Sequence, residues 1–227
     1  MAKTIQHKNN IAFFGDTEQL QASRQLTYPA MFFELLSGRK PNEAELKVFE
    51  LILNLTIDHG PDTPSAKAVI SSGKVGKTIS EAVAAGVLEI NDIHGGAGEA
   101  CMEMFYRIKK DEITPVKFVS ESLTAKKRLP GYGHRIYEID PRVELIFAVM
   151  GELGIGGEFI SIAKDLEKEL KLQSGKNLPI NIDGAIAVAL CAFGWEPLLA
   201  KALFISARVP GLCCQFVNNM PNTQNAK

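Results

Sequence analysis

Apolar residues recur along most of the chain at the spacing that places them on one face of a helix. Residues 42–57 show this pattern most clearly, and Asn42 with Glu45 three positions later forms a pair typical of a capping box. Residues 159–172 carry the same apolar stripe, with lysine and glutamate on the opposite face. Alternation of apolar and polar residues with a period of two, which indicates a half-buried strand, never runs for long. The pattern therefore predicts helices and few strands.

Glycines and prolines divide the pattern into about ten short segments. Helices are expected over residues 28–36, 42–57, 65–72, 77–88, 100–109, 116–124, 143–153, 159–172, 196–207 and 211–219, and an apolar helix is expected to open within 179–184 and to end at 193. Residues 1–25 are polar apart from an apolar patch at 11–14, and the polar tail 220–227 is expected to fray. We predict a single all-α domain over 1–227, and the pattern leaves open a smaller lobe around 114–205.

The composition narrows the class of protein. A chain of 227 residues can build one substantial core or two modest ones. The formal net charge of -1 argues against a nucleic-acid partner, because phosphate binding leaves a basic excess. The four cysteines form no CxxC pair, so neither a metal site nor a disulfide framework is expected. The start of the chain lacks an apolar signal core and no uncharged apolar run approaches the ~20 residues of a membrane span, so we expect a cytoplasmic protein without a membrane partner.

Residues 129–142 hold the densest group of candidate side chains. Pro130 and the glycines on either side of residue 132 oppose a helix, so His134 is expected on a tight turn that can aim an imidazole into a cleft. Asp140 and Pro141 then supply an N-cap and a first helical residue, which places Arg142 in the first turn of a helix. A ligand anion held by the arginine and the helix N–H groups would explain a cation there, and a solvated surface arginine is the alternative.

Three of the four histidines, His59, His94 and His134, each lie beside glycine at a helix boundary. Asp183 lies in a long apolar run, and burial raises the pKa of a carboxyl group, which suits a base that takes a proton from carbon. A helix N-cap is an alternative role for Asp183, and the two roles do not exclude each other. Arg208 is also set among apolar residues, so it needs an anion, either an internal acid or a substrate carboxylate.

Several of these segments together resemble the citrate synthase superfamily. The matching segments are Gly131-Tyr132-Gly133-His134-Arg135, Asp140-Pro141-Arg142, Asp58-His59-Gly60, His94-Gly95-Gly96-Ala97, Asn181-Ile182-Asp183-Gly184 and Arg208-Val209-Pro210-Gly211. The resemblance covers about residues 28–219 and implies a multi-helix bundle, here in a short form that lacks most of the N-terminal region. Residues 58–105 and 178–190 also resemble the C-terminal module of ATP-citrate lyase, and stand-alone citryl-CoA lyases are built at this reduced length.

The resemblance implies a role for each matching side chain. Asp183 would be the base that removes a methyl proton from acetyl-CoA, His94 would hydrogen-bond the thioester oxygen, and His134 would hydrogen-bond the carbonyl of oxaloacetate. The substrate carboxylates would be held by His59, Arg142 and Arg208. The CoA phosphates would lie near basic residues of two loops, Lys126, Lys127, Arg128 and Lys176.

The chain departs from the family pattern at several positions. Glu138 stands where family members often carry a basic residue near the CoA phosphates, and the tail after Arg208 has no arginine to lend to a partner subunit. His94 is synthase-like, whereas the ATP-citrate lyase module departs from histidine there.

The leading hypothesis is cleavage of citryl-CoA to acetyl-CoA and oxaloacetate by retro-Claisen chemistry, with a CoA thioester as substrate and with no metal or covalent cofactor. One alternative is a short citrate or 2-methylcitrate synthase, which also hydrolyses the thioester. Another is a non-catalytic CoA-binding subunit of the same fold. The resemblance further implies a role beside the TCA cycle, a citryl-CoA synthetase as partner, and a homodimer or larger assembly with contacts through residues 77–88 and 101–108.

Overall fold

The computed structural model describes residues 4–92 and 94–220. Eleven helices dominate these residues, which confirms the predicted all-α class. The elements in chain order are β1 (Ile5–Lys8), β2 (Ile11–Phe14), β3 (Thr17–Glu18), α1 (Gln19–Gln25), α2 (Tyr28–Ser37), α3 (Glu43–Thr56), α4 (Pro64–Lys74), α5 (Ile79–Leu88), α6 (Ala97–Lys110), α7 (Pro115–Thr124), α8 (Pro141–Glu152), α9 (Gly157–Ser174), α10 (Ile182–Ala192) and α11 (Leu198–Asn219).

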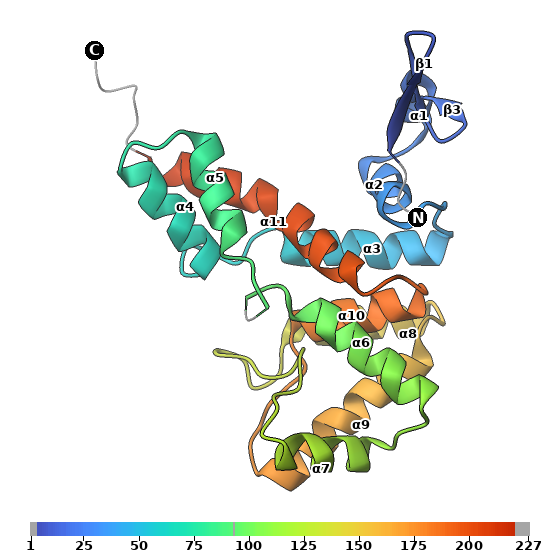
Figure 1. Ribbon diagram of the computed structural model, residues 1–227, viewed down its shortest axis with the longest axis vertical. Helices are drawn as coiled ribbons and strands as arrows, with labels where there is room; N and C mark the ends of the chain where they lie inside the picture. Colours follow the sequence, from blue (N-terminus) through green and yellow to red (C-terminus); the bar gives the residue numbers. More distant parts are fainter. Residues whose placement is uncertain (1–3, 93, 221–227) are drawn as a thin grey trace.

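The N-terminal strands form a small antiparallel sheet in the order β1-β2-β3, with Ile5 opposite Phe14. Asn9 and Asn10 connect β1 to β2 with φ angles of 50° and 63°, which asparagine tolerates better than most residues and which suit a tight hairpin. The apolar pattern predicts no element in this region, so periodicity missed the sheet. Figure 1 shows that the sheet and α1 lie at one end, apart from the main helical body.

α10 lies in the centre of the largest hydrophobic core, and every residue from Ile182 to Cys191 is buried. A helix that is apolar on all sides needs neighbours on all sides, and α10 contacts α3, α6, α8, α9 and α11 (Figure 1). The N-terminal end of this helix is therefore held in place by the bulk of the core. A single domain over 1–227 with a smaller lobe around 114–205 stays a prediction.

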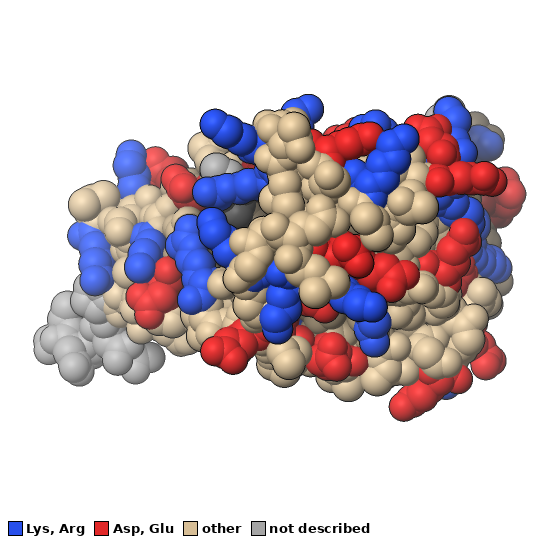
Figure 2. Space-filling model, turned by 90° about the horizontal axis from the view of Figure 1, so that it is seen from below, with Lys and Arg blue, Asp and Glu red and all other residues tan. Residues whose placement is uncertain are grey.

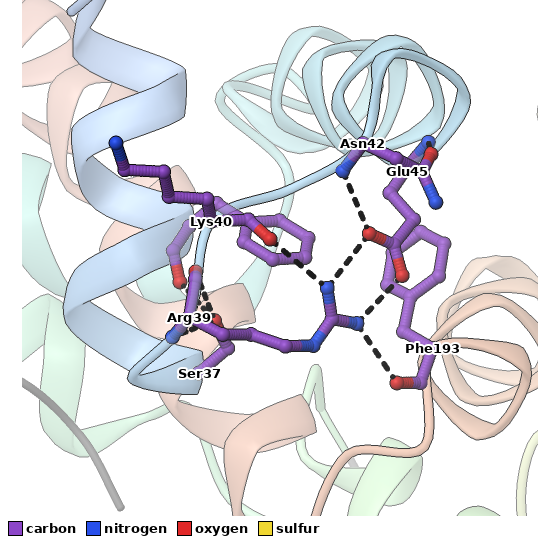
Figure 3. Close-up of polar contacts among 7 residues, drawn as sticks. Ser37, Arg39, Lys40, Asn42, Glu45 and Phe193 are labelled. Atoms are coloured by element: carbon purple, nitrogen blue, oxygen red, sulfur yellow. Dashed lines mark hydrogen bonds and ion pairs between the residues drawn. The ribbon is translucent and has the colours of Figure 1, made fainter.

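Arg39 ties the connection between α2 and α3 to the C-terminal end of α10 (Figure 3). Its Nη1 and Nη2 bind Glu45 Oε2 and Oε1 at 2.7 and 2.6 Å, and Nη2 also donates to the carbonyl of Phe193 at 3.1 Å. Asn42 Oδ1 accepts from the Glu45 N–H at 2.8 Å, and Glu45 Oε2 accepts from the Asn42 N–H at 2.9 Å. These reciprocal bonds confirm the predicted capping box.

The C-terminal helix corrects the prediction of two helices over 196–207 and 211–219. α11 is one helix that contains Pro210, although an interior proline removes a backbone hydrogen bond and costs about 3 kcal/mol. Contacts on both sides of the proline hold the two halves in line. Arg208 Nε donates to the carbonyl of Thr56 at 2.7 Å, and Gly211 lies so close to the Ile57 carbonyl that a Cβ would overlap it.

Two helices bear on the predicted dimer contact and on the predicted absence of a membrane span. On α6, which contains residues 101–108 of the predicted dimer contact, the apolar side chains Cys101, Met104, Phe105 and Ile108 are buried inside the chain. The dimer contact stays a prediction. α11 is long and apolar enough to cross a membrane by length and composition, yet in this fold it packs along α3, α4, α5 and α6.

Candidate active site

A cavity of about 400 Å³ lies where several turns and helix ends meet. All six side chains predicted for catalysis or substrate binding line it, namely His59, His94, His134, Arg142, Asp183 and Arg208. The four residues predicted to contact CoA do not line this cavity, and all are exposed, namely Lys126, Lys127, Arg128 and Lys176. The fold thus gathers the predicted core of the site and leaves the predicted CoA residues outside it.

One wall of the cavity consists of two backbone segments in direct contact. The Gly133 N–H donates to the Pro179 carbonyl at 2.7 Å, and the Asn181 N–H donates to the Gly131 carbonyl at 2.9 Å. Gly131 has a φ of +81°, and a Cβ at Gly184 would lie 2.6 Å from the Gly131 oxygen. Both positions therefore require glycine. The turn that carries the histidine and the helix start that carries the aspartate form one unit.

Asp183 is the second residue of α10 and is buried. The N-cap is Asn181, whose Oδ1 accepts from the N–H groups of Asp183 and Gly184 at 3.0 and 3.2 Å, so the N-cap interpretation of Asp183 is wrong. Burial raises the pKa of Asp183 to about 6, while Arg142 and Arg208 act in the opposite direction. At neutral pH the carboxyl group is therefore mostly ionised. A small fall in pH suffices to protonate it, because its pKa lies close to neutral pH, as suits a general base.

His134 is fixed by its own turn. Its Nδ1 accepts from the N–H groups of Ile136 and Tyr137, both at 3.0 Å, and its ring stacks on Tyr137 at 4.6 Å between centroids. In the neutral ring the proton must then be on Nε2. Arg142 Nη2 lies 3.5 Å from Nε2, but both atoms are donors, so the Nε2–H remains for a ligand oxygen. The pKa of His134 is lowered overall, mainly by burial. The charge of Asp140 raises this pKa, and the charge of Arg142 lowers it further.

His94 is held through one ring nitrogen. Its Nε2 lies 3.0 Å from the hydroxyl of Ser65 on α4, which leaves Nδ1 for a ligand in the cavity. Burial, followed by the charges of Arg208, Arg135 and His59, lowers the pKa of His94 to about 4. The ring is therefore neutral at physiological pH and can act as a hydrogen-bond donor without carrying charge.

Arg142 already has an anion inside the protein. Its Nε and Nη2 bind Asp140 Oδ1 and Oδ2 at 2.9 and 2.7 Å, and the Asp140 side chain is fully buried. Asp140 Oδ1 also accepts from the Arg142 N–H at 3.1 Å, which makes it the N-cap of α8 as expected. The anion that explains a cation in this first turn is thus Asp140. This corrects the expectation that a ligand explains it.

Arg208 has no comparable partner. The residue is 2% exposed, its Nε donates to the Thr56 carbonyl at 2.7 Å, and its guanidinium lies 4.9 Å from the centroid of the Phe204 ring. No carboxylate within residues 4–92 and 94–220 forms an ion pair with Arg208. Burial lowers the pKa of Arg208, and Asp58 and Asp183 act in the opposite direction from farther away. A buried cation beside a cavity favours an anionic ligand.

The structure adds residues that the sequence analysis did not select. Arg135 and Phe204 line the cavity, and Ser65 holds His94. Arg135 is adjacent to His134, and Phe204 lies one helical turn before Arg208, so sequence spacing could have indicated both. Ser65 is 29 residues from His94 and carries no such signal.

His59 completes the cavity. Its ring centroid lies 6.3 Å from that of His134, and burial, then Arg142 and Arg208, lower its pKa. A second cavity of about 490 Å³ shares His134, Arg135 and Ile136 with the first, and it extends past Glu138 to Lys171 on α9 and Asn177 in the loop that follows. The two spaces together can accommodate a ligand much larger than a dicarboxylic acid. Among the described residues, no group of three or more His, Cys, Asp or Glu side chains is arranged to hold a metal ion.

Comparisons with known proteins identify the family and the fold of the chain. A family model for the citrate synthase C-terminal domain matches residues 1–226. The structure of citryl-CoA lyase from Hydrogenobacter thermophilus has a TM-score of 0.90 and 34% identity, and the match covers 96% of this chain and 86% of that one. The ATP citrate lyase of Methanosaeta concilii, solved in complex with (3S)-citryl-CoA, has a TM-score of 0.87 at 20% identity over 96% of this chain and 38% of that one, which is a likeness of fold.

The curated citrate synthase of Heyndrickxia coagulans is 29% identical over 227 residues, which is 95% of this chain and 58% of that protein. The chain covers 52% of a second, the citrate synthase of Haloferax volcanii, at 27% identity. The chain therefore spans about half the length of the curated citrate synthases that it matches.

Proposed function

The chain belongs to the citrate synthase family, and on that premise we propose that it cleaves citryl-CoA to acetyl-CoA and oxaloacetate. One observation carries the proposal. A single cavity holds a buried carboxyl with a pKa of about 6, two histidines that present ring nitrogens, and a buried arginine that lacks a carboxylate partner within the described residues. Removing a proton from a weakly acidic carbon requires a base and hydrogen-bond donors to the developing oxyanion. A reacting partner that carries carboxylates also requires a cation to bind it.

The proposed steps are simplest in the direction of condensation. Ionised Asp183 takes a proton from the methyl group of acetyl-CoA, while His94 donates a hydrogen bond to the thioester oxygen and stabilises the enol. The enol carbon attacks the carbonyl carbon of oxaloacetate, and the Nε2–H of His134 hydrogen-bonds the carbonyl oxygen as it becomes an alkoxide. The alkoxide takes up one proton and protonated Asp183 loses one, so both side chains return to their starting states. In cleavage the citryl hydroxyl loses its proton beside His134, the carbon–carbon bond breaks, and protonated Asp183 gives a proton to carbon.

Binding of the carboxylates would fall mainly to Arg208. Its buried guanidinium gains most from an anion, because the cost of its desolvation is not offset by an internal ion pair. Arg142 and His59 line the same cavity and would add contacts to the second carboxylate. Arg142 keeps Asp140 as a partner, so it contributes a fixed donor geometry more than a free charge.

We also propose that the CoA moiety leaves the first cavity through the second, past Arg135 and Lys171. Figure 2 shows lysine and arginine side chains across this whole face, whereas acidic side chains are fewer on the side where the segment between α7 and α8 lies in Figure 1. Two sets of contacts to the CoA phosphates stay predictions, those from Lys126, Lys127 and Arg128 in this segment and those from Lys176. The effect of Glu138 on CoA binding also stays a prediction.

A short citrate synthase is the second candidate. His94 favours it, because this residue is synthase-like in the resemblance, and curated citrate synthases match most of the chain. A synthase would hydrolyse the thioester of citryl-CoA after the same condensation. The two candidates therefore share the roles of Asp183, His94 and His134 and differ only in the fate of the thioester.

We propose a homodimer or larger homo-oligomer. Exposed apolar side chains occur on three helices that contact one another, with Ile79 and Leu88 on α5, Val217 on α11 and Val75 at the end of α4. A second copy of the chain would cover them, as would suit an obligate interface. Light scattering at micromolar concentration would show at least 50 kDa, roughly twice the 24.8 kDa chain, and an active monomer would contradict the proposal. A cytoplasmic location, a place beside the TCA cycle and a citryl-CoA synthetase partner stay predictions.

The thioester decides between the two candidate functions. The protein is incubated with acetyl-CoA and oxaloacetate, and free CoA thiol and citryl-CoA are followed by chromatography. A lyase produces citryl-CoA up to equilibrium and releases little free CoA, whereas a synthase releases one CoA for each citrate. Sustained release of CoA that depends on oxaloacetate would overturn the lyase proposal and support the synthase.

A further inference from the structure

Asn181 contacts both segments of the wall that carries the proposed base and the proposed proton donor. Its Oδ1 accepts from the N–H groups of Asp183 and Gly184 at 3.0 and 3.2 Å. Its Nδ2 donates to the carbonyl of Gly133, the residue before His134, at 2.9 Å. One amide side chain therefore bonds to the backbone of both segments within two residues of each catalytic side chain.

We propose that Asn181 is a positioning residue that sets the placement of His134 relative to Asp183, an inference that rests on the proposed function of these two residues. The two segments already touch, since a Cβ at Gly184 would collide with the Gly131 oxygen. Two backbone hydrogen bonds, from the Gly133 N–H to the Pro179 carbonyl and from the Asn181 N–H to the Gly131 carbonyl, set the register of the two segments. The amide adds a side-chain bond at the Gly133 carbonyl, next to His134, and so holds the end of the turn that carries this histidine.

The amide group is the right chemistry for this role. It offers an acceptor for the two helix N–H groups and a donor for the Gly133 carbonyl at the same time. Aspartate and serine are equally good N-caps, so either would keep the start of α10. Neither has an N–H that reaches the carbonyl. Substitution by serine therefore removes the bond between the turn and the helix and leaves the cap. Aspartate also leaves the cap, and in addition it sets a carboxylate oxygen against the Gly133 carbonyl and a negative charge near Asp183.

The neighbouring side-chain contacts serve other purposes. Glu167 on α9 accepts from the Ile180 N–H at 2.8 Å, and the Tyr132 hydroxyl donates to the Ala163 carbonyl at 3.0 Å. Each of these contacts anchors one segment to α9 from behind. Asn181 differs from both because it joins the two segments to each other.

The test compares wild type with Asn181→Asp and Asn181→Ser, and with Asn42→Asp as a matched control at the N-cap of α3, outside the cavity. The measurements are kcat and KM for citryl-CoA cleavage and for condensation, the melting temperature, and the ring nitrogen shifts of His134 by NMR. We expect both Asn181 variants to lower kcat about 10- to 100-fold with KM changed less than about threefold, since a displacement near 1 Å can cost this much. The His134 shifts should move in both, and the control should match wild type.

Wild-type kcat in both Asn181 variants, or equal losses in the control, would overturn the positioning role. A wild-type protein that condenses acetyl-CoA with oxaloacetate but does not cleave citryl-CoA would overturn the proposed lyase function instead. The kcat for condensation would then be the measurement that tests the role of Asn181. If the wild type turned over neither substrate, the proposed function would fail. Unchanged His134 shifts in the Asn181 variants would then overturn the positioning role as well, and changed shifts would support it.

Discussion

The cavity has two sides that are built in different ways. On the Arg142 side, formed by His134, Asp140 and Arg142, Asp140 offsets the charge of the arginine, and Nδ1 of His134 is bonded to its own turn. On the Arg208 side, formed by His94 and Arg208, the arginine is buried against a carbonyl and an aromatic ring, without a carboxylate partner within 4–92 and 94–220.

This difference separates structural charge from functional charge. Removing one member of a buried ion pair leaves the other uncompensated, which costs about 3–5 kcal/mol of stability. Removing Arg208 breaks no ion pair, although it takes a cation away from Asp183 and a hydrogen bond away from the Thr56 carbonyl. Its loss should therefore cost less stability than loss of Arg142 and weaken ligand binding more. Two arginines in one cavity therefore predict opposite consequences for folding and for binding.

Asp183 lies between the two sides, since both arginines lower its pKa. We expect Asp183→Asn to reduce citryl-CoA turnover at least about 100-fold, because it removes the proposed base and changes little in size. Oxaloacetate affinity, measured by calorimetry, should stay the same or increase, because a negative charge near Arg208 is lost. Asp165→Asn, an exposed change outside the cavity, is the control. If Asp183→Asn raised the Kd for oxaloacetate as much as Arg208→Leu does, proton abstraction and carboxylate binding could not be assigned to different residues.

His94 tests the chemistry of the Arg208 side. His94→Ala should slow the exchange of acetyl-CoA methyl protons with deuterium about 100-fold, the scale for one donor to a developing oxyanion. Ser65→Ala removes only the neutral hydrogen bond that orients the ring and should slow exchange roughly fivefold, near 1 kcal/mol. Proton NMR in D₂O measures both rates. Equal effects of the two changes, or none from His94→Ala, would assign His94 a structural role.

The two arginines form the direct comparison. Arg208→Leu should raise the Kd for oxaloacetate roughly 10- to 100-fold, as expected for lost charged hydrogen bonds. It should lower stability by about 1–3 kcal/mol, because the buried Thr56 carbonyl loses its hydrogen bond. Arg142→Leu should leave Asp140 buried and unpaired, which lowers the melting temperature by roughly 6–20 °C. Differential scanning calorimetry with and without oxaloacetate measures both effects. The difference between the two sides disappears if Arg208→Leu destabilises the fold as much as Arg142→Leu does.

The pH dependence of proton exchange gives the smallest effect. The raised pKa of Asp183 means that the base is ionised above about pH 6 and protonated below it. Exchange of acetyl-CoA protons should therefore fall about tenfold for each pH unit below this value. Arg208→Leu removes a cation that lowers this pKa, so its profile should shift to higher pH. A profile that is flat from pH 5 to 8 would exclude Asp183 as the base.

Local sequence signals predict which side chains meet at the cavity, while their roles stay predictions. His59, His94 and His134 each lie beside glycine at a helix boundary, and the cavity brings all three together. Asp183 and Arg208 are charged residues in apolar runs, and both are buried. Such signals work because a turn or an apolar run determines the surroundings of a side chain over only a few residues.

Features that depend on distant contacts or on single residues were missed. Pro210 does not end α11, because the contacts that hold the helix straight come from the end of α3, more than 150 residues away. The N-terminal hairpin depends on Asn9 and Asn10 rather than on alternation. The N-cap of α10 is Asn181, two residues before the expected Asp183, and pattern analysis does not resolve such an offset.

The most direct test of the proposed function is the product analysis of citryl-CoA cleavage. Purified protein is mixed with synthetic citryl-CoA, and acetyl-CoA, oxaloacetate, free CoA and citrate are quantified over time by chromatography. We predict that acetyl-CoA and oxaloacetate appear in equal amounts, that each matches the citryl-CoA consumed, and that Asp183→Asn suppresses both together. Free CoA and citrate as the main products, or no consumption of citryl-CoA by the wild type, would contradict the proposal.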